Sequence, residues 1–238
     1  MSTLLTSEEF GEALAAARQS AHGTLHPFSQ SWARGEFTRA QLGQWAIQHF
    51  YYVDAIAQQF AVLFSRLPDL DARTELLENL IGEEMPGKPG KRHPELLAKF
   101  ARACGVRDLD LYHAEERGLI LPTTRAMRSW IWELASVRTM AEAFAGIMVA
   151  LEGQLPTLYP MLVEAMHRMN LSDDDLEFFH VHIVNDVGHA ASGLAIARRY
   201  ANTPELQERA IAAVRASAQM RYSMLSGIHA QLTLRDAA

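Results

Sequence analysis

The chain has little cysteine, no long apolar run and no excess of basic charge, and each shortage argues against a class of protein. Cys104, the single cysteine in 238 residues, excludes an intrachain disulfide and is consistent with a reducing cytosol. No apolar run approaches the roughly 20 residues that a membrane span requires, so we expect no membrane partner. The 22 Lys and Arg residues are outnumbered by 28 Asp and Glu residues, which argues against nucleic acid as a partner.

The first residues also lack the features of a signal peptide. The segment MSTLLTSEEFGEAL becomes acidic too early and predicts an amphipathic helix with Ser7 at its N-cap. We therefore expect a cytoplasmic protein. The sequence leaves open whether the chain forms a homodimer.

Alternation of apolar and polar residues with period two is missing as well, which predicts a fold without a sheet. The apolar residues instead recur at helical spacing between prolines and glycines. This pattern predicts an all-α protein, and its length allows one or two domains. The expected helices cover residues 7–21, part of 22–37, 38–67, 71–84, 94–105, 121–137, 139–169, 172–200 and 204–232.

The most informative stretch is residues 178–190, FFHVHIVNDVGHA. It places His182, Asp186 and His189 at positions i, i+4 and i+7, which share one face of an α-helix. We expect these side chains to converge on one point of a helix that is buried nearly all round, because the residues between them include Val184 and Val187. The stripe is either a hydrogen-bonded core network or a metal site for iron, zinc or manganese.

A second unusual acid is Glu152, which stands in the apolar segment FAGIMVALEGQLPTLYPML. A lone carboxylate in such surroundings is costly unless it has a partner. Pro156 follows four residues later and removes the helical donor for the carbonyl of Glu152, so we expect a kink there.

Other polar residues carry weaker signals. Glu83 continues the apolar stripe of Leu76 and Leu80, and Glu84 is the competing candidate for the inward position. Both precede the loop MPGKPGKR and His93. The alternative interpretation is that the carboxylate and His93 are ordinary surface residues. His49 and Tyr52 lie on the inward face of the helix predicted over 38–67. They are either ordinary core residues or the lining of a pocket.

Taken in order, five segments resemble the haem-oxygenase-like superfamily: HPFSQSWARGEF, QHFYYVDA, NLIGEE with a loop and HPELL, ALEGQLP, and H-x-x-x-D-x-x-H. The nearest branches are the pyrroloquinoline-quinone synthases and the iron-containing diiron oxidases, including the chlamydial protein associating with death domains. The resemblance covers nearly the full chain. It implies a single domain over 1–238, folded as a seven-helix bundle with a buried central site.

Carried over residue by residue, the diiron branch implies six metal ligands. The ligand carboxylates Glu83, Glu152 and Asp186 are the expected catalytic residues, and an acid of this set is able to bridge two metal ions. Helical spacing adds His49, Tyr52 and Tyr159 as expected pocket residues beside this site. His26 matches a pocket histidine of the quinone-synthase branch, although it is also placed to start a helix before Pro27. The implied ligands are Glu83, His93, Glu152, His182, Asp186 and His189.

The chain departs from three other branches in ways that matter for function. The cofactorless quinone synthases have a tyrosine and an arginine at the positions of His182 and Asp186. The death-domain-associated branch, which makes 4-aminobenzoate from its own side chains, has a lysine at the position of Leu162. Thiaminase-type members use a cysteine on a middle helix, whereas Cys104 lies near a helix end.

The resemblance therefore implies an O2-dependent non-haem diiron oxidase or oxygenase. Its cofactor would be two Fe(II) ions, O2 would be the co-substrate, and its partner would be a small carboxylate, amine or aromatic precursor. The alternatives are a cofactorless oxidase like the quinone synthases and a non-enzymatic interaction protein stabilised by metal.

Overall fold

The computed structural model describes residues 3–236, which form helices and connecting turns without a strand in that range. This confirms the predicted all-α class. Three irregular turns are η1 (Gly23–Leu25) and η3 (Glu152–Gln154), both 3₁₀, and η2 (Ala145–Val149), a π-helical turn. The α-helices are α1 (Ser7–Gln19), α2 (Pro27–Ala33), α3 (Arg39–Val53), α4 (Ile56–Arg66), α5 (Leu70–Glu84), α6 (His93–Ala103), α7 (Asp108–Tyr112), α8 (Pro122–Ser136), α9 (Met140–Phe144), α10 (Leu155–Arg168), α11 (Glu177–Tyr200) and α12 (Pro204–Asp236).

Local capping explains where several helices begin. The N-cap of α1 is Thr6, not Ser7 as predicted: its hydroxyl accepts from the backbone N–H of Glu9, whose carboxylate in turn accepts from the backbone of Thr6. Thr38 caps α3 as predicted, through the same reciprocal arrangement with Gln41.

Two predicted helices are each broken in the structure, so the described residues contain more helical segments than the seven expected. The helix predicted over 38–67 is interrupted at Asp54 and Ala55, which separate α3 from α4. No proline or glycine marks this break; it lets α4 turn to pack on α5 and α8. The helix predicted over 139–169 is divided into α9, η2, η3 and α10, next to the expected kink before Pro156.

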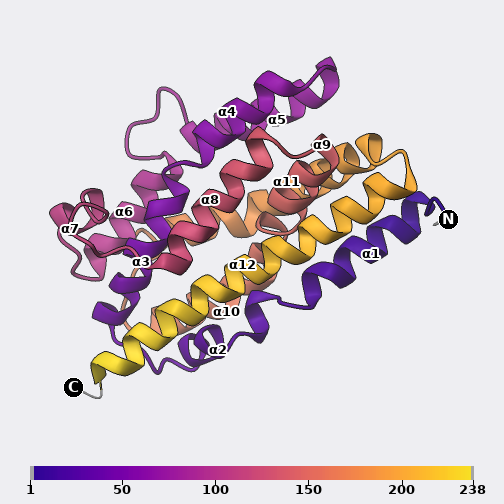
Figure 1. Ribbon diagram of the computed structural model, residues 1–238. Coiled ribbons are helices and arrows are strands. Elements are labelled where there is room, and N and C mark those ends of the chain that lie inside the picture. Colours follow the sequence, from indigo (N-terminus) through magenta and orange to yellow (C-terminus); the bar gives the residue numbers. More distant parts are fainter. Residues whose placement is uncertain (1–2, 237–238) are drawn as a thin grey trace.

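The long helix α12 organises the bundle. It runs along the molecule with α1 and α8 on either side of it and also packs against α9 and η2 (Figure 1). Behind it, α11 contacts α9, α10 and η2. The buried apolar side chains, from Phe10 in α1 to Leu232 in α12, form one continuous cluster.

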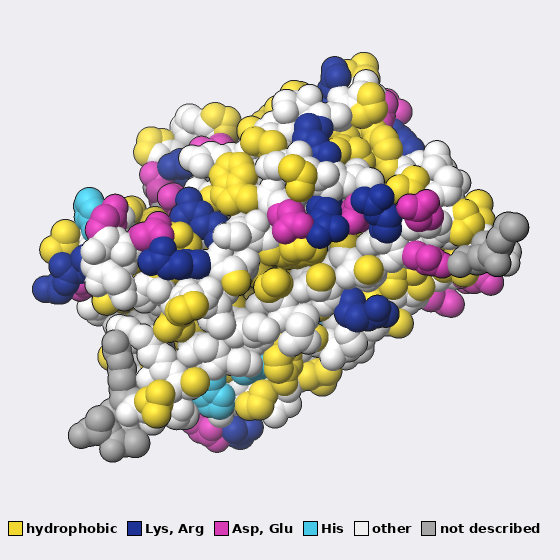
Figure 2. Space-filling model, in the orientation of Figure 1, with side chains coloured by type: hydrophobic (Ala, Val, Ile, Leu, Met, Phe, Trp, Pro, Cys, Tyr) yellow, Lys and Arg dark blue, Asp and Glu magenta, His cyan; other side chains and the backbone are white. Residues whose placement is uncertain are grey.

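The surface mixes charges of both signs. Figure 2 shows acidic and basic side chains interspersed on the face presented there. Surface pairs such as Arg138 with Glu133, 2.6 Å apart, account for part of this pattern. Within residues 3–236, no helix is both long and apolar enough to cross a bilayer.

Close packing of α11 against η2 depends on Gly193. A Cβ atom placed on Gly193 would lie 2.4 Å from Cβ of Met148, and this neighbour has no freedom to rotate away. The same helix contains Gly188, which is exposed and has no neighbour within 4 Å of such a Cβ. The two glycines therefore differ in packing but not in helical context.

We expect Gly193→Ala to lower the free energy of unfolding by about 1–3 kcal/mol, because the added methyl forces α11 away from η2. Gly188→Ala should instead raise it by about 0.5–1 kcal/mol, since alanine loses less backbone entropy in a helix. Urea unfolding followed by circular dichroism measures both. Equal effects of the two substitutions would show that α11 and η2 are not packed this closely.

Candidate metal centre

The end of α5 and the start of α6 position a carboxylate and an imidazole face to face. Met85 adopts a left-handed conformation with φ of 41°, which ends α5 directly after Glu83 and Glu84. The following loop returns to Arg92, whose guanidinium binds both carboxylate oxygens of Glu84 at 2.8 and 2.9 Å. This ion pair closes the loop and leaves Glu83 and His93 facing the interior.

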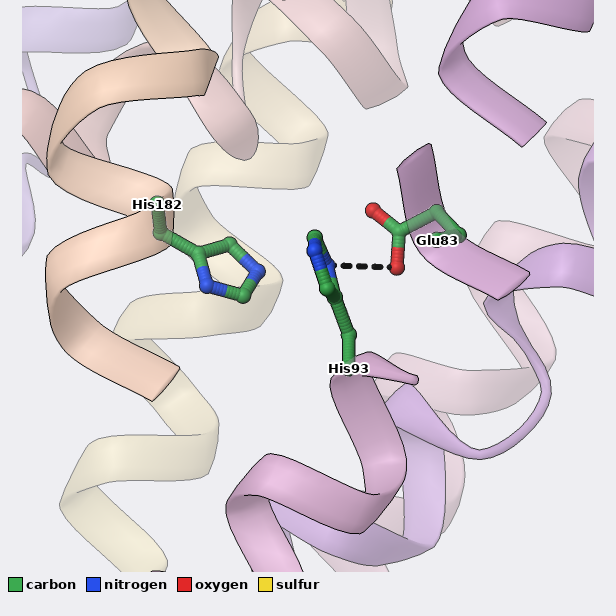
Figure 3. A group of neighbouring side chains, drawn as sticks. All are labelled: Glu83, His93 and His182. Carbon is green, nitrogen blue, oxygen red and sulfur yellow. Dashed lines mark ion pairs between the residues drawn. The ribbon is translucent and has the colours of Figure 1, made fainter. Parts of the chain in front are cut away.

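Glu83, His93 and His182 form a first triad, and all three side chains are buried. Figure 3 shows the ring of His93 between the carboxylate of Glu83 and the ring of His182, each from a different helix. Nδ1 of His93 lies 2.8 Å from Oε2 of Glu83 yet has no hydrogen bond of acceptable geometry. One ligand atom from each residue lies within 4.8 Å of the others, as a shared metal ion would require.

Glu152, Asp186 and His189 form a second triad with the same spacing of ligand atoms. Nδ1 of His189 lies 3.2 Å from Oδ1 of Asp186 and 3.4 Å from Oε2 of Glu152. Oε2 of Glu152 and Oδ2 of Asp186 have no hydrogen-bond partner among the described residues. Buried acceptors of this kind need a cation or a donor.

The two triads correct the simplest interpretation of the α11 stripe. His182, Asp186 and His189 share the inner face of α11, but they do not converge on one point: His182 belongs to the first triad and the other two to the second. The prediction that α11 is buried nearly all round is also wrong. Val184 and Val187 are 72% and 60% exposed, because only one face of α11 packs on the bundle.

An irregular backbone delivers Glu152 to the second triad. The π turn η2 and the 3₁₀ turn η3 precede α10, and such turns shift the direction of the side chains that follow. Two side chains donate to carbonyls in this stretch: Nη1 of Arg18 in α1 donates to Val149 O at 3.0 Å, and Nε2 of Gln154, four residues away, donates to Ala150 O at 2.7 Å. These two hydrogen bonds stabilise the interruption of the helix between α9 and α10.

In the first triad His182 is neutral as a ligand must be, whereas His93 would have to lose a proton to bind a metal ion. Burial, with the nearby charge of His93, lowers the pKa of His182 to about 3, so its imidazole is neutral. Nδ1 of His182 lies 2.6 Å from the carbonyl of Phe178, which fixes the N–H there and leaves Nε2 as the ligand atom. Burial opposes the charged forms of Glu83 and His93, but each stabilises the other, so the pKa of Glu83 falls and that of His93 rises.

The second triad holds excess negative charge. Burial raises the pKa of Asp186 to about 7, and the charges of Glu152 and Glu83 act in the same direction. Burial opposes protonation of His189, but the two carboxylates beside it outweigh burial and raise its pKa to about 10. A proton on His189 or a divalent cation can balance these acids.

A cavity of about 40 Å³, here the metal-side cavity, borders both triads through Glu83, Glu152 and His182. His49, Tyr52 and Tyr159, three of the predicted pocket residues, also line it. Nε2 of His49 lies 3.2 Å from the hydroxyl of Tyr52 and 3.2 Å from that of Tyr159. Burial lowers the pKa of His49 well below its usual range and raises the pKa values of both phenols, so all three groups are neutral.

The fourth predicted pocket residue lies elsewhere. His26 is buried at the start of α2, where Nδ1 accepts from the backbone N–H of Phe28 and Nε2 lies 2.9 Å from Oγ of Ser226. It does not line the metal-side cavity. Of the two roles predicted for His26, the structure therefore shows the one at the start of α2.

Two arginines near the site are not among the residues predicted from the sequence. Arg18 supports η2, and Arg221 of α12 lines the metal-side cavity. A pattern does reveal Arg221: it interrupts the apolar stripe of α12 at helical spacing, between Ala218 and Leu225.

A further group of metal-binding residue types lies on the surface. His167, Asp173 and His180 approach one another as closely as the members of each triad, but His167 and Asp173 are exposed. This exposed cluster is separate from the cavity, and a metal titration has to exclude it.

The structure distinguishes Glu83 from Glu84, and metal titration tests the distinction. In a His167→Ala background, which removes the exposed cluster, anaerobic Fe(II) titration should saturate near two per chain. Glu83→Ala should reduce this to about one, because the first triad loses its carboxylate. Glu84→Ala should keep two, since Glu84 pairs with Arg92. The reverse ranking would assign the ligand to Glu84.

Comparison with known proteins agrees with this geometry. Residues 43–222 match the family model described as iron-containing redox enzyme. The chain is 32% identical to 4-aminobenzoate synthase of Nitrosomonas europaea over 222 residues, covering 89% of this chain and 87% of that one. It is 28% identical to pyrroloquinoline-quinone synthase of Granulibacter bethesdensis over 230 residues, covering 95% and 87%.

A solved structure gives the fold independently. A domain of unknown function with a haem-oxygenase-like fold, from Shewanella denitrificans, superimposes with a TM-score of 0.79 at 16% identity, over 98% of this chain and 96% of that one. The fold agreement spans nearly the whole of both chains. Together with the family match, it shows that this chain belongs to the iron-containing redox enzymes with a haem-oxygenase-like fold.

Proposed function

We propose that this chain is an O2-dependent non-haem diiron oxidase or oxygenase that acts on a small organic substrate in the metal-side cavity. The observation that carries the proposal is the pair of buried triads bordering one cavity. Three imidazoles and three carboxylates are donors that suit iron, and one triad for each ion gives two sites. Bound iron would supply the reduction of O2 and the oxidation of the substrate.

The protein's own residues prepare this chemistry. Apolar side chains such as Ile147, Leu151 and Phe178 line the metal-side cavity and keep bulk water out. The carbonyl of Phe178 orients His182, as partners of ligand histidines usually do. The neutral phenols of Tyr52 and Tyr159, both in contact with His49, hold protons beside the substrate position.

The residues present favour this reaction over a cofactorless oxidase. His182 and Asp186 occupy the positions where the quinone synthases have a tyrosine and an arginine, and both are buried within the triads. An oxidase without metal would leave the buried carboxylates of the triads to be balanced by protonated imidazoles alone.

Two further alternatives are also less well supported. Leu162 stands where the 4-aminobenzoate branch has a lysine, and a leucine has no amine, so self-modification through that residue is not favoured. A purely structural metal site is normally fully ligated and closed. A cavity that reaches ligand residues from both triads instead leaves room for O2 and a substrate.

Oxygen consumption by the Fe(II)-loaded chain tests the proposal. We expect the loaded protein to consume O2 and His182→Ala or Asp186→Ala to slow consumption at least about tenfold, because each removes a ligand. The matched control is His180→Ala, which changes a histidine of the same helix outside both triads. An oxygen electrode measures the rates.

Equal rates in the wild type, His182→Ala and Asp186→Ala would contradict the proposal. So would a tightly bound single zinc ion that Fe(II) does not replace. Either result would point to a structural metal site.

A further inference from the structure

Arg221 is a buried cation in the apolar stripe of α12. It is 5% exposed and stands between Ala218 and Leu225, both also buried. A charged side chain in such a position needs a partner, because a buried charge without one destabilises the fold.

The described residues give Arg221 little compensation. Its one hydrogen bond within residues 3–236 runs from Nη2 to the hydroxyl of Tyr52, at a long 3.4 Å, and Nε has no partner. The partly buried Arg66 differs: it donates to the carbonyls of Ala135 and Arg138 at 2.6 and 2.5 Å. The exposed Arg209 pairs with the buried carboxylate of Glu142 at 2.8 Å.

Three polar groups close to Arg221, on His49, Tyr52 and Tyr159, are neutral. Glu83 and Glu152 line the same cavity, but among the described residues neither forms an ion pair with Arg221. Burial and the charge of Arg221 together lower the pKa of His49, so this imidazole is uncharged. Burial keeps the phenols of Tyr52 and Tyr159 protonated. Within residues 3–236 the guanidinium of Arg221 has no ion-pair partner, so its charge is available to a bound anion.

Arg221 faces a space that a ligand can occupy. It lines the metal-side cavity together with Glu83, Glu152 and His182. It also lines an adjoining cavity of about 20 Å³ walled by aromatic side chains, among them Trp32 and Trp45. His49 and Tyr159 border both spaces, so Arg221 and its neutral neighbours lie where the two cavities meet.

We propose that Arg221 anchors the carboxylate of a small monocarboxylic substrate, with the apolar body of that molecule against Ile147, Leu151 and Phe178 beside the triads. A guanidinium binds a carboxylate through two parallel hydrogen bonds. One cation in a cavity of about 40 Å³ suits a monoanion, whereas a phosphate group carries nearly two charges and needs more donors. The identity of the carboxylate as a substrate rests on the proposed diiron function.

Calorimetry with simple carboxylates tests the anchor. Acetate, benzoate and octanoate, each paired with its uncharged alcohol (ethanol, benzyl alcohol and octanol), are titrated into the full chain, once stripped of metal with chelator and once loaded with Fe(II) under argon. At least one carboxylate should bind the stripped chain at least about tenfold more tightly than its alcohol. Arg221→Met should remove this difference, and Arg221→Lys should retain part of it.

The matched control is Arg215→Met, which removes an exposed arginine from the same helix and should leave binding unchanged. Should Arg221→Met fail to fold, Arg221→Gln keeps a hydrogen-bond donor for Tyr52 and decides the question. No carboxylate preference in the wild type, or an equal preference in the folded Arg221 variant, would overturn the proposal.

The stripped chain separates this inference from the proposed function. Arg221-dependent binding there, with no oxygen consumption after iron loading, would support the anchor and contradict the oxidase. Oxygen consumption without any carboxylate preference would support the oxidase and contradict the anchor.

Discussion

The structure depends on the cost of keeping ionised carboxylates inside an apolar helical bundle. Glu83 and Asp186 are buried, and an isolated buried carboxylate would shift its pKa or unfold its surroundings. Each acid is therefore held beside an imidazole: Glu83 beside His93, and Asp186 beside His189. The two triads are the arrangement in which the acids and imidazoles can also share a divalent cation.

This constraint explains the departures from regular helix. The left-handed Met85 ends α5 so that the chain can return and face His93 toward Glu83. The π turn η2 lies shortly before Glu152 and leaves carbonyls that Arg18 and Gln154 satisfy. At η2 one of these donors, Arg18, comes from α1, 131 residues away in the sequence.

The same cost of burying a charged group applies to Arg221. The two triads contain acids that balance their imidazoles, and the partly buried Arg66 donates to backbone carbonyls. Arg221 has a long hydrogen bond to a neutral phenol and borders the cavity that the triads share. An oxidising centre beside a fixed cation would select substrates by charge before any chemistry occurs, and it would hold them in one orientation.

The sequence by itself determined the helical class and the inner faces of several helices, because both follow from spacing along the chain. The 3.6-residue period placed His182, Asp186 and His189 on one face of α11, and the stripe of Leu76 and Leu80 favoured Glu83 over Glu84. The family resemblance added His93 and Glu152 to this set.

Tertiary structure alone decided which of these residues meet. Spacing on α11 could not show that His182 joins Glu83 and His93 while Asp186 and His189 join Glu152, because those partners come from other helices. Nor could it locate the π turn or the break at Asp54, which no local proline or glycine dictates. Whether a polar side chain is paired or left free is a property of long-range packing, and for Arg221 only the folded chain reveals it.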